Sequence, residues 1–312
     1  SYNMLKVLLP RLGITTTFVD PDDPKNFADA VQEKTRLFFA ESLGNPKLDV
    51  LDLKGISREA KSAKVPFMVD STLATPALQN PIAHGVNIVI HSLTKYANGN
   101  GSTMGGAIVD AGNFDWSSGK FPEFTTPSDG YHGLVLHDVL GPAAYIAKVR
   151  IEGLRDLGAA ISPFNAFQII QGLETLDIRM KKHSENALAL AEWLEAHEDV
   201  AWVNYPGLKS SKYNELAKKY LPEGQSGLLA FGLKGGFDAG KTVADETKLF
   251  ALVANFGDSK SLVIHPASTT HQQLTPEEQA STGVTPDLIR LSVGLENVED
   301  LKADLQQAFD KV

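Results

Sequence analysis

Three polar side chains that could act together each lie shortly after an apolar run. Asp70, Lys95 and Asn45 occupy these positions, within five residues of the end of a run. The runs are rich in aromatic and β-branched residues and cover 37–40, 66–69 and 87–90. In parallel sheets the carboxyl ends of neighbouring strands share one edge, where ligands usually bind. We therefore expect a carboxylate, a lysine and an amide to converge at that edge.

These groups have the chemistry that pyridoxal phosphate (PLP) requires. Lys95 can form an imine with the cofactor's aldehyde, and it becomes a useful base where burial or a nearby cation lowers its pKa. Asp70 can hold the protonated ring nitrogen, which keeps the ring an electron sink. The hydroxyls of Ser92 and Thr94 can donate to a phosphate, and Asn45 can donate to the ring hydroxyl or to a substrate carboxylate. We therefore predict a PLP site.

Each residue also has a simpler interpretation. Asp70 could cap a following helix, Lys95 could be a solvated loop lysine, and Asn45 before a proline is a common turn pair. Taken singly, each residue admits its simpler interpretation. Their joint position at one sheet edge favours the site.

The elements that must position these residues alternate along the first part of the chain. Near-continuous apolar strands separated by helical segments are typical of a parallel sheet with both faces covered. The expected strands cover 15–19, 37–40, 66–69, 87–90 and 106–109, and the expected helices cover 24–34, 52–64 and 76–84.

Later segments predict a second, smaller α/β unit. Residues 111–141 mix glycine, proline and aromatic residues and predict a long loop. Ser162 followed by proline predicts the start of a helix that continues to about His197, with a bend near Gly172. We expect domains at 1–182 (binding the cofactor and lacking its N-terminal part) and 183–312. Further expected strands cover 202–204, 228–231 and 288–293, with helices near 239–254 and 297–310.

At four places the sequence resembles the Cys/Met-metabolism PLP enzymes, of the fold-type I aminotransferase superfamily. The resemblance covers essentially the whole chain and implies an α/β fold with a mainly parallel large sheet and a smaller C-terminal domain. The matching strings are Glu41-Ser42-Leu43-Gly44-Asn45-Pro46, Val69-Asp70-Ser71-Thr72, His91-Ser92-Leu93-Thr94-Lys95-Tyr96 and Arg290-Leu291-Ser292-Val293-Gly294-Leu295-Glu296.

This resemblance implies a role for each site residue. Lys95 would carry PLP as a Schiff base and act as the catalytic base, and Asp70 would pair with the ring nitrogen. Ser92 and Thr94 would hold the phosphate. Asn45 would contact the ring hydroxyl.

The resemblance also implies substrate-binding residues. Arg290 would bind the substrate carboxylate, a task that suits the two-pronged guanidinium; a surface ion pair with Glu296 is the alternative. Asn255 stands where relatives that cleave cystathionine tend to have serine. This difference and the aromatic insert at 121–133 resemble the O-acetylhomoserine sulfhydrylase branch.

For that branch the implied reaction is γ-replacement. O-acetylhomoserine would react with sulfide or a small thiol to give homocysteine, in methionine biosynthesis, and acetate. The alternatives within the class are a cystathionine γ-synthase or γ-lyase and a methionine γ-lyase. From another class, residues 235–242 fit the phosphate-loop pattern of nucleotide-binding proteins. A strand-to-helix turn explains those residues equally well, and we favour it.

Composition excludes several partners. The formal net charge is −9, which opposes binding to nucleic acid or an anionic membrane. No apolar run approaches the roughly 20 residues that span a bilayer. Cysteine is absent, which fits a reducing compartment, and we expect a cytoplasmic enzyme. The eight histidines form no ligand pattern, so we expect no metal. The resemblance implies a homo-oligomer, a dimer or tetramer.

The start of the chain carries one further expectation. Family members hold PLP with a phosphate-binding loop and a stacking tyrosine that precede the region matching Ser1. We expect Tyr2 not to replace that tyrosine, because it lies past the matching position. Residues 1–312 alone would then bind PLP poorly.

Overall fold

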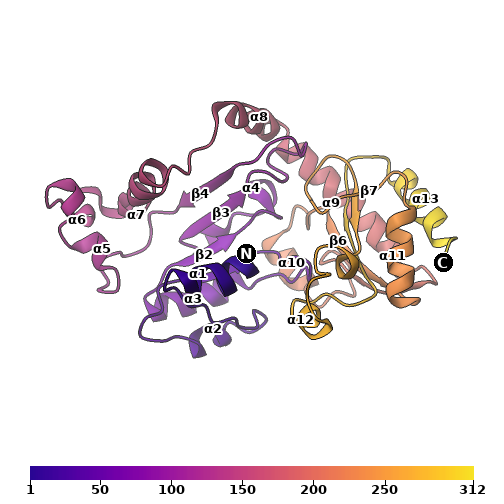
Figure 1. The fold of residues 1–312 in the computed structure, drawn as a ribbon, viewed down its shortest axis with the longest axis horizontal. Helices are drawn as coiled ribbons and strands as arrows, with labels where there is room; N and C mark the ends of the chain where they lie inside the picture. The colour runs from indigo at the N-terminus through magenta and orange to yellow at the C-terminus, as the bar shows by residue number, and fades with distance from the viewer.

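The computed structural model describes residues 1–312, apart from the side chain of Ser281. Two sheets form its framework, with strand orders β1-β2-β3-β4 and β5-β6-β9-β8-β7. Figure 1 shows the first sheet in the half of the molecule that holds the N-terminus and the second in the half that holds the C-terminus. This is an α/β fold, as expected.

The first sheet places the predicted site residues at its edge. Strands β1 (Phe38–Glu41), β2 (Phe67–Asp70) and β3 (Ile88–Ser92) are parallel, and their register pairs Glu41 with Asp70. Strand β4 (Gly106–Asp110) is antiparallel to β3. The loop at 93–105 contains no helix that could carry a parallel crossover, so the chain reverses direction instead.

Two predictions for this half are wrong. Residues 15–19 form no strand, because they lie mostly exposed and pair with no neighbouring strand. The helix expected at 24–34 shortens to one turn. The helices before and around the sheet are a π-helix at Met4–Leu8, α1 (Leu9–Arg11), α2 (Lys25–Asp29), α3 (Leu53–Ala63), α4 (Thr75–Leu78) and a 3-10 helix at Pro81–His84.

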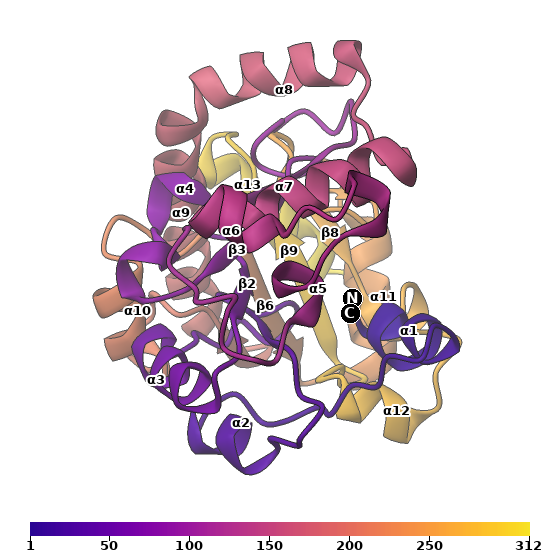
Figure 2. The same ribbon diagram turned by 90° about the vertical axis from the view of Figure 1, so that its left-hand side faces the viewer.

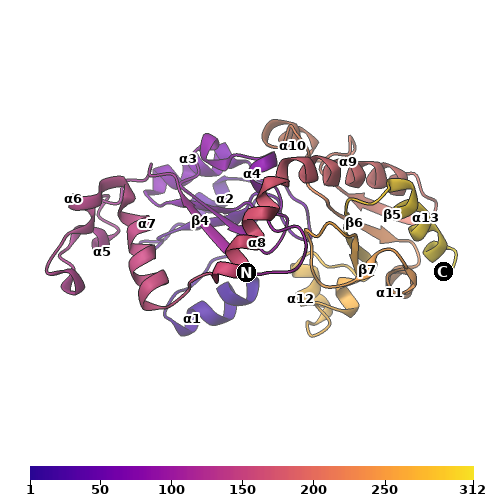
Figure 3. The same cartoon turned by 90° about the horizontal axis from the view of Figure 1, so that it is seen from above.

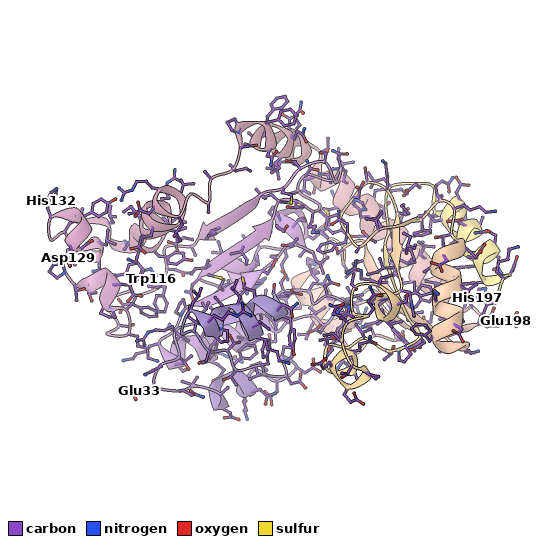
Figure 4. The ribbon with its side chains drawn as sticks, in the orientation of Figure 1. Glu33, Trp116, Asp129, His132, His197 and Glu198 are labelled. Atoms are coloured by element: carbon purple, nitrogen blue, oxygen red, sulfur yellow. The ribbon has the colours of Figure 1, made fainter. Side chains whose placement is uncertain are left out.

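Residues 111–141 do not form a simple loop. Trp116 stacks on Tyr145 with ring centroids 5.0 Å apart and lies against Phe121 and Phe124, and this aromatic cluster orders the segment. Figure 4 shows Trp116 within the extension at this end of the molecule. Figure 2 shows α6 and α7 in front of the first sheet. The helices are α5 (Pro122–Thr125), a 3-10 turn at Asp129–Tyr131, α6 (Leu136–Leu140), a 3-10 turn at Gly141–Ala143, α7 (Ala144–Lys148) and a π-helix at Val149–Asp156.

Two long helices connect the sheets (Figure 3). The predicted start of α8 (Pro163–Glu174) is confirmed, since Ser162 Oγ accepts a hydrogen bond from Asn165 N at 3.1 Å. The chain breaks at Thr175 before α9 (Leu176–Glu195), three residues beyond the expected bend. The domain boundary proposed after residue 182 falls inside α9 and stays a prediction.

The second sheet matches three expected strands and adds two short ones. The helix expected at 239–254 ends at Glu246, because the chain then turns to form an edge strand. The strands are β5 (Val200–Asn204), β6 (Leu228–Leu233), β7 (Ala251–Leu252), β8 (Leu262–Ile264) and β9 (Leu288–Ser292). The helices are α10 (Asn214–Tyr220), α11 (Gly236–Glu246), a 3-10 turn at Pro266–Ser268, α12 (Pro276–Ser281) and α13 (Val298–Phe309).

The phosphate-loop pattern forms a packed strand-to-helix turn. Gly235 caps α11, and a side-chain carbon added there would lie 2.5 Å from Ala239 Cβ. Asp238 lies in the first helical turn, where it would repel a phosphate at the helix start. Close packing therefore accounts for the glycine without a nucleotide.

One core unites the two halves. Leu73 and Leu78 from the first half pack in the same buried cluster as Met180 of α9 and Leu228 and Val293 of the second half. The carboxyl edge of β1–β3 and the near end of β9 are thereby fixed together. No described helix is long and apolar enough to cross a membrane.

Candidate active site

Lys95 ends in contact with a loop of the second half of the chain. Its Nζ donates a hydrogen bond to Asn255 Oδ1 at 2.5 Å and lies 4.7 Å from the centroid of the Phe256 ring. Burial lowers the pKa of Lys95, and the positive charge of Arg290 lowers it further. Both effects favour the neutral amine, which is the form that attacks an aldehyde or accepts a proton.

Arg290 on β9 is the second fixed cation. Its Nη1 donates to Asn45 Oδ1 at 3.1 Å, and its Nη2 donates to the Asn255 carbonyl oxygen at 3.0 Å. Burial lowers the pKa of Arg290 to about 10, so the group remains charged at neutral pH. Its Nε is buried and has no hydrogen-bond partner among the described residues. An unsatisfied charged donor of this kind favours an anionic ligand.

The alternative ion pair of Arg290 does not form. The Glu296 carboxylate accepts instead from Ser261 N at 2.7 Å and Ser261 Oγ at 2.8 Å. Glu296 therefore fastens a loop, and Arg290 stays available to the site.

A cavity of about 260 Å³ joins these groups. It brings together Lys95, Asn45 and Arg290, which the sequence predicted, with Asn255 at its border through the two hydrogen bonds above. Its lining consists of Asn45, Pro46, Lys95, Ala254, Phe256, Ile264, Pro266, Thr270, His271 and Arg290.

A larger cavity of about 780 Å³ adjoins the same edge from the N-terminal side. Asn45 lines both cavities, and Glu41 and Tyr2 line the larger one. The tyrosine ring packs against Phe18, with centroids 5.2 Å apart. Asn45 therefore lies where the two spaces approach each other.

Asp70 is held from within its own loop rather than by a helix. Its Oδ1 accepts from Thr72 N at 2.9 Å and from Thr72 Oγ1 at 2.5 Å, and Thr72 Oγ1 accepts from Ser92 N at 2.8 Å. The helix-cap interpretation fails, because α4 has no side-chain cap. No described residue donates a hydrogen bond to Asp70 Oδ2, so one carboxylate oxygen remains available to a ligand.

The two predicted phosphate hydroxyls differ. Ser92 Oγ has no hydrogen bond to a described residue, whereas Thr94 Oγ1 accepts from Gly105 N at 3.1 Å and donates to Gly105 O at 3.3 Å. Neither residue lines the smaller cavity. Thr94 would have to exchange its bond to Gly105 O for a bond to phosphate.

Sequence reasoning assigned no role to three neighbours of the site. Glu41 pairs with Asp70 in the register, and burial followed by repulsion from Asp70 raises the pKa of Glu41 to about 7. Burial lowers the pKa of His91, although Asp70 acts in the opposite direction. Phe256 lies beneath both site cations. The sequence held a signal for each of them, because Glu41 and His91 lie at the ends of strands and Phe256 follows Asn255.

The residues present fit pyridoxal phosphate. A lysine with a lowered pKa, a carboxylate with a free oxygen and an arginine with an unpaired buried Nε are groups of the types that bind its aldehyde, its ring nitrogen and a substrate carboxylate. Asn45 and Ser92 supply further polar groups at the same edge.

Comparisons with known proteins agree with this chemistry. The model of the family "Cys/Met metabolism PLP-dependent enzyme" matches residues 1–310. An O-acetyl-L-homoserine sulfhydrylase of Leptospira meyeri is 52% identical over 321 aligned residues, which cover 100% of this chain and 73% of the relative. A homocysteine synthase of Schizosaccharomyces pombe is 50% identical, with 99% of this chain and 73% of the relative covered.

A solved structure extends the likeness to the fold. The crystal structure of an O-acetylhomoserine (thiol)-lyase from Campylobacter jejuni has a TM-score of 0.95 and 43% identity, covering 99% of this chain and 74% of that one. That protein contains N'-pyridoxyl-lysine-5'-monophosphate, a lysine joined to the cofactor. With a family match along nearly its whole length and a fold-type I scaffold around a lysine of lowered pKa, the chain belongs to the Cys/Met metabolism PLP-dependent enzymes.

Proposed function

We propose that the protein catalyses γ-replacement of O-acetylhomoserine by sulfide or a small thiol. The Cγ–O bond breaks to release acetate, and a Cγ–S bond forms to give homocysteine with sulfide or the corresponding thioether with a thiol. The observation that carries this proposal is the placement of Lys95 and Arg290 around one cavity. It occurs in a chain about half identical, along nearly its full length, to an O-acetyl-L-homoserine sulfhydrylase and a homocysteine synthase.

Arg290 would bind and orient the amino-acid carboxylate. Its guanidinium lies on a strand, and its two hydrogen bonds to Asn45 and Asn255 fix the plane of the fork. The buried Nε adds a donor that has no described partner. A planar, charged fork matches a carboxylate in geometry as well as charge.

Lys95 would move the protons. Bound pyridoxal phosphate supplies an electron sink that stabilises negative charge next to the amino carbon of the substrate. The lowered pKa of Lys95 increases the share of neutral amine that can accept the α-proton and then carry protons at Cβ. Asn255 Oδ1 accepts a hydrogen bond from Nζ and thereby sets the direction of the amine.

The remaining residues would orient the cofactor. Asp70, fixed by Thr72, would hold the ring nitrogen with its free carboxylate oxygen. Ser92 and Thr94 would bind phosphate, and Asn45 would contact the ring hydroxyl. The phosphate-binding role is better supported for Ser92, whose hydroxyl is free, than for Thr94, whose hydroxyl is bonded to Gly105.

Parallel assays with three substrates test the proposed reaction. Purified protein loaded with pyridoxal phosphate is given O-acetylhomoserine with sulfide, O-succinylhomoserine with sulfide, or cystathionine alone. Homocysteine is measured for the two esters, and cysteine and 2-oxobutyrate are measured for γ-cleavage of cystathionine. We expect the acetyl ester with sulfide to give the highest kcat/KM. Faster cleavage of cystathionine would move the protein to the lyase branch.

We also propose that the protein acts as a homo-oligomer through α8. Phe164, Phe167 and Ile170 are 66%, 57% and 58% exposed on a helix whose only charged residue is Glu174. An exposed apolar face without charge can pack against its own copy across a twofold axis without charge repulsion. Light scattering should show a dimer or tetramer that Phe167→Glu weakens.

We further propose that the enzyme works in the cytoplasm, where free amino acids and reduced sulfur are available. Cell fractionation followed by immunodetection checks this location. Recovery of the protein outside the cytoplasmic fraction would contradict it.

A further inference from the structure

Arg179 of α9 binds the backbone that directly follows Lys95. Its Nη1 donates to the Tyr96 carbonyl oxygen at 2.7 Å, and its Nη2 lies 3.5 Å from the Ala97 carbonyl oxygen. These two carbonyls belong to the first residues after the proposed cofactor lysine. The guanidinium is half-buried, and burial lowers the pKa of Arg179.

The same guanidinium is anchored on its other side. Arg179 Nη2 donates to the Gly172 carbonyl oxygen near the end of α8 at 2.6 Å, and Nε donates to Thr175 Oγ1 at 3.0 Å. The side chain therefore cannot move without breaking hydrogen bonds at the junction of the two long helices. It connects the helical framework to the Lys95 loop.

Two glycines show how closely these parts fit. A side-chain carbon at Gly99 would lie 2.3 Å from Arg179 Nη1, and one at Gly172 would lie 2.4 Å from the Asn98 carbonyl oxygen. The loop and the helix end thus meet at backbone distance. A displaced Arg179 would leave the loop without its hydrogen bonds to α9.

The loop at 95–99 also packs against the segment that contacts the lysine amine. A side-chain carbon at Gly257 would lie 2.6 Å from Tyr96 N and 3.1 Å from Lys95 Cβ, and Ser259 N donates to the Gly99 carbonyl oxygen at 2.8 Å. The segment at 255–259 is therefore packed on the loop at 95–99. Asn255, which bonds Nζ, begins that segment.

We propose that Arg179 is a positioning residue for Lys95, holding the loop at 95–99 so that Nζ meets Asn255 at the cavity. This inference rests on the proposed role of Lys95 as the cofactor lysine. Arg179 touches neither the cavity nor Nζ, so it acts through the backbone of the loop.

Geometry and charge make different predictions. Among the described residues, burial is the larger cause of the lowered pKa of Lys95, and the charge of Arg290 is the second. Arg179 does not act on that pKa by its charge. A substitution that keeps the positive charge but loses the fork, Arg179→Lys, should therefore still disturb the lysine. If the role of Arg179 were purely electrostatic, Arg179→Lys would leave the pKa of Lys95 unchanged.

The experiment follows Lys95 in apoprotein and in holoenzyme. Arg179→Met, Arg179→Lys and the control Lys181→Met, an exposed residue of the same helix, are compared with the parent. The rate at which pyridoxal phosphate attaches to apoprotein is measured against pH by visible absorbance. Borohydride trapping and peptide mass analysis identify the lysine. The pH profile of kcat in the loaded enzyme gives a second pH midpoint for Lys95.

A less buried Lys95 has a higher pKa, so both pH midpoints should move upward. We expect a shift of roughly one pH unit in Arg179→Met, within the range that burial produces. A smaller shift is expected in Arg179→Lys and none in Lys181→Met. Circular dichroism verifies folding, and Arg179→Lys decides the matter if Arg179→Met does not fold.

Two results would overturn the inference separately. Folded Arg179 variants with the parent's midpoints, while trapping still finds Lys95, would reduce Arg179 to a helix anchor and leave the proposed function intact. Trapping on a different lysine in the parent would overturn both the inference and the proposed role of Lys95.

Discussion

Replacing Arg290 by lysine tests the carboxylate site most quantitatively. The change keeps a positive charge on β9 but removes the planar fork, which bonds Asn45 Oδ1 at 3.1 Å and the Asn255 carbonyl oxygen at 3.0 Å. A single ammonium cannot make both of these bonds and also present two parallel donors to a carboxylate. The variant should therefore bind the amino acid more weakly.

The expected magnitude follows from the hydrogen bond that the lysine cannot make. A hydrogen bond involving a charged group contributes about 1.5–3 kcal/mol, and the variant forms only one of the two bonds to the carboxylate. Because about 1.4 kcal/mol corresponds to a factor of ten, KM for O-acetylhomoserine should rise by about 10- to 100-fold. The chemical step occurs at other atoms, so kcat should fall by much less.

Steady-state kinetics with saturating sulfide separate the two constants. Arg58→Lys, a substitution at an exposed position of α3, serves as the matched control and should leave both unchanged. An unaltered KM in Arg290→Lys would refute the reasoning. A fall in kcat alone would instead place Arg290 in the chemical step.

Two other substitutions probe the first sheet. Asp70→Asn should keep the fold and lower kcat by about 10²–10⁴, because a neutral amide no longer holds a protonated ring nitrogen; near-normal turnover would contradict this role. Glu41 has a folded pKa of about 7, above its ordinary 4.5, so folding takes up a proton and stability falls as pH rises from about 4.5 to 7. Glu41→Gln should remove that loss, at most about 3 kcal/mol, in denaturant titrations between these pH values; a parent whose stability does not change there would disprove the assignment.

The local sequence pattern was sufficient to predict site residues that lie at or just after the end of a strand. Asp70 ends β2 and Lys95 follows β3, so short apolar runs and the edge rule for parallel sheets placed both residues. Residues 162 and 163 likewise started a helix as expected, because an N-cap serine and proline act within one turn.

The features that the sequence did not predict depend on tertiary contacts. The bond between Lys95 and Asn255 joins residues 160 positions apart, and no local period signals it. Thr94 is turned toward Gly105 by the antiparallel return of β4, whose direction depends on the intervening loop. The aromatic cluster around Trp116 ordered a segment whose glycine and proline content favoured a loop.

The central claim is that Lys95 carries the cofactor. The protein is incubated with pyridoxal phosphate and reduced with borohydride, and its peptides are then analysed by mass spectrometry beside Lys95→Ala treated in the same way. The account predicts a pyridoxyl group on the peptide containing Lys95, loss of the visible absorbance on reduction, and no labelled peptide or turnover in the variant. A pyridoxyl group on another lysine, with turnover retained in Lys95→Ala, would contradict it.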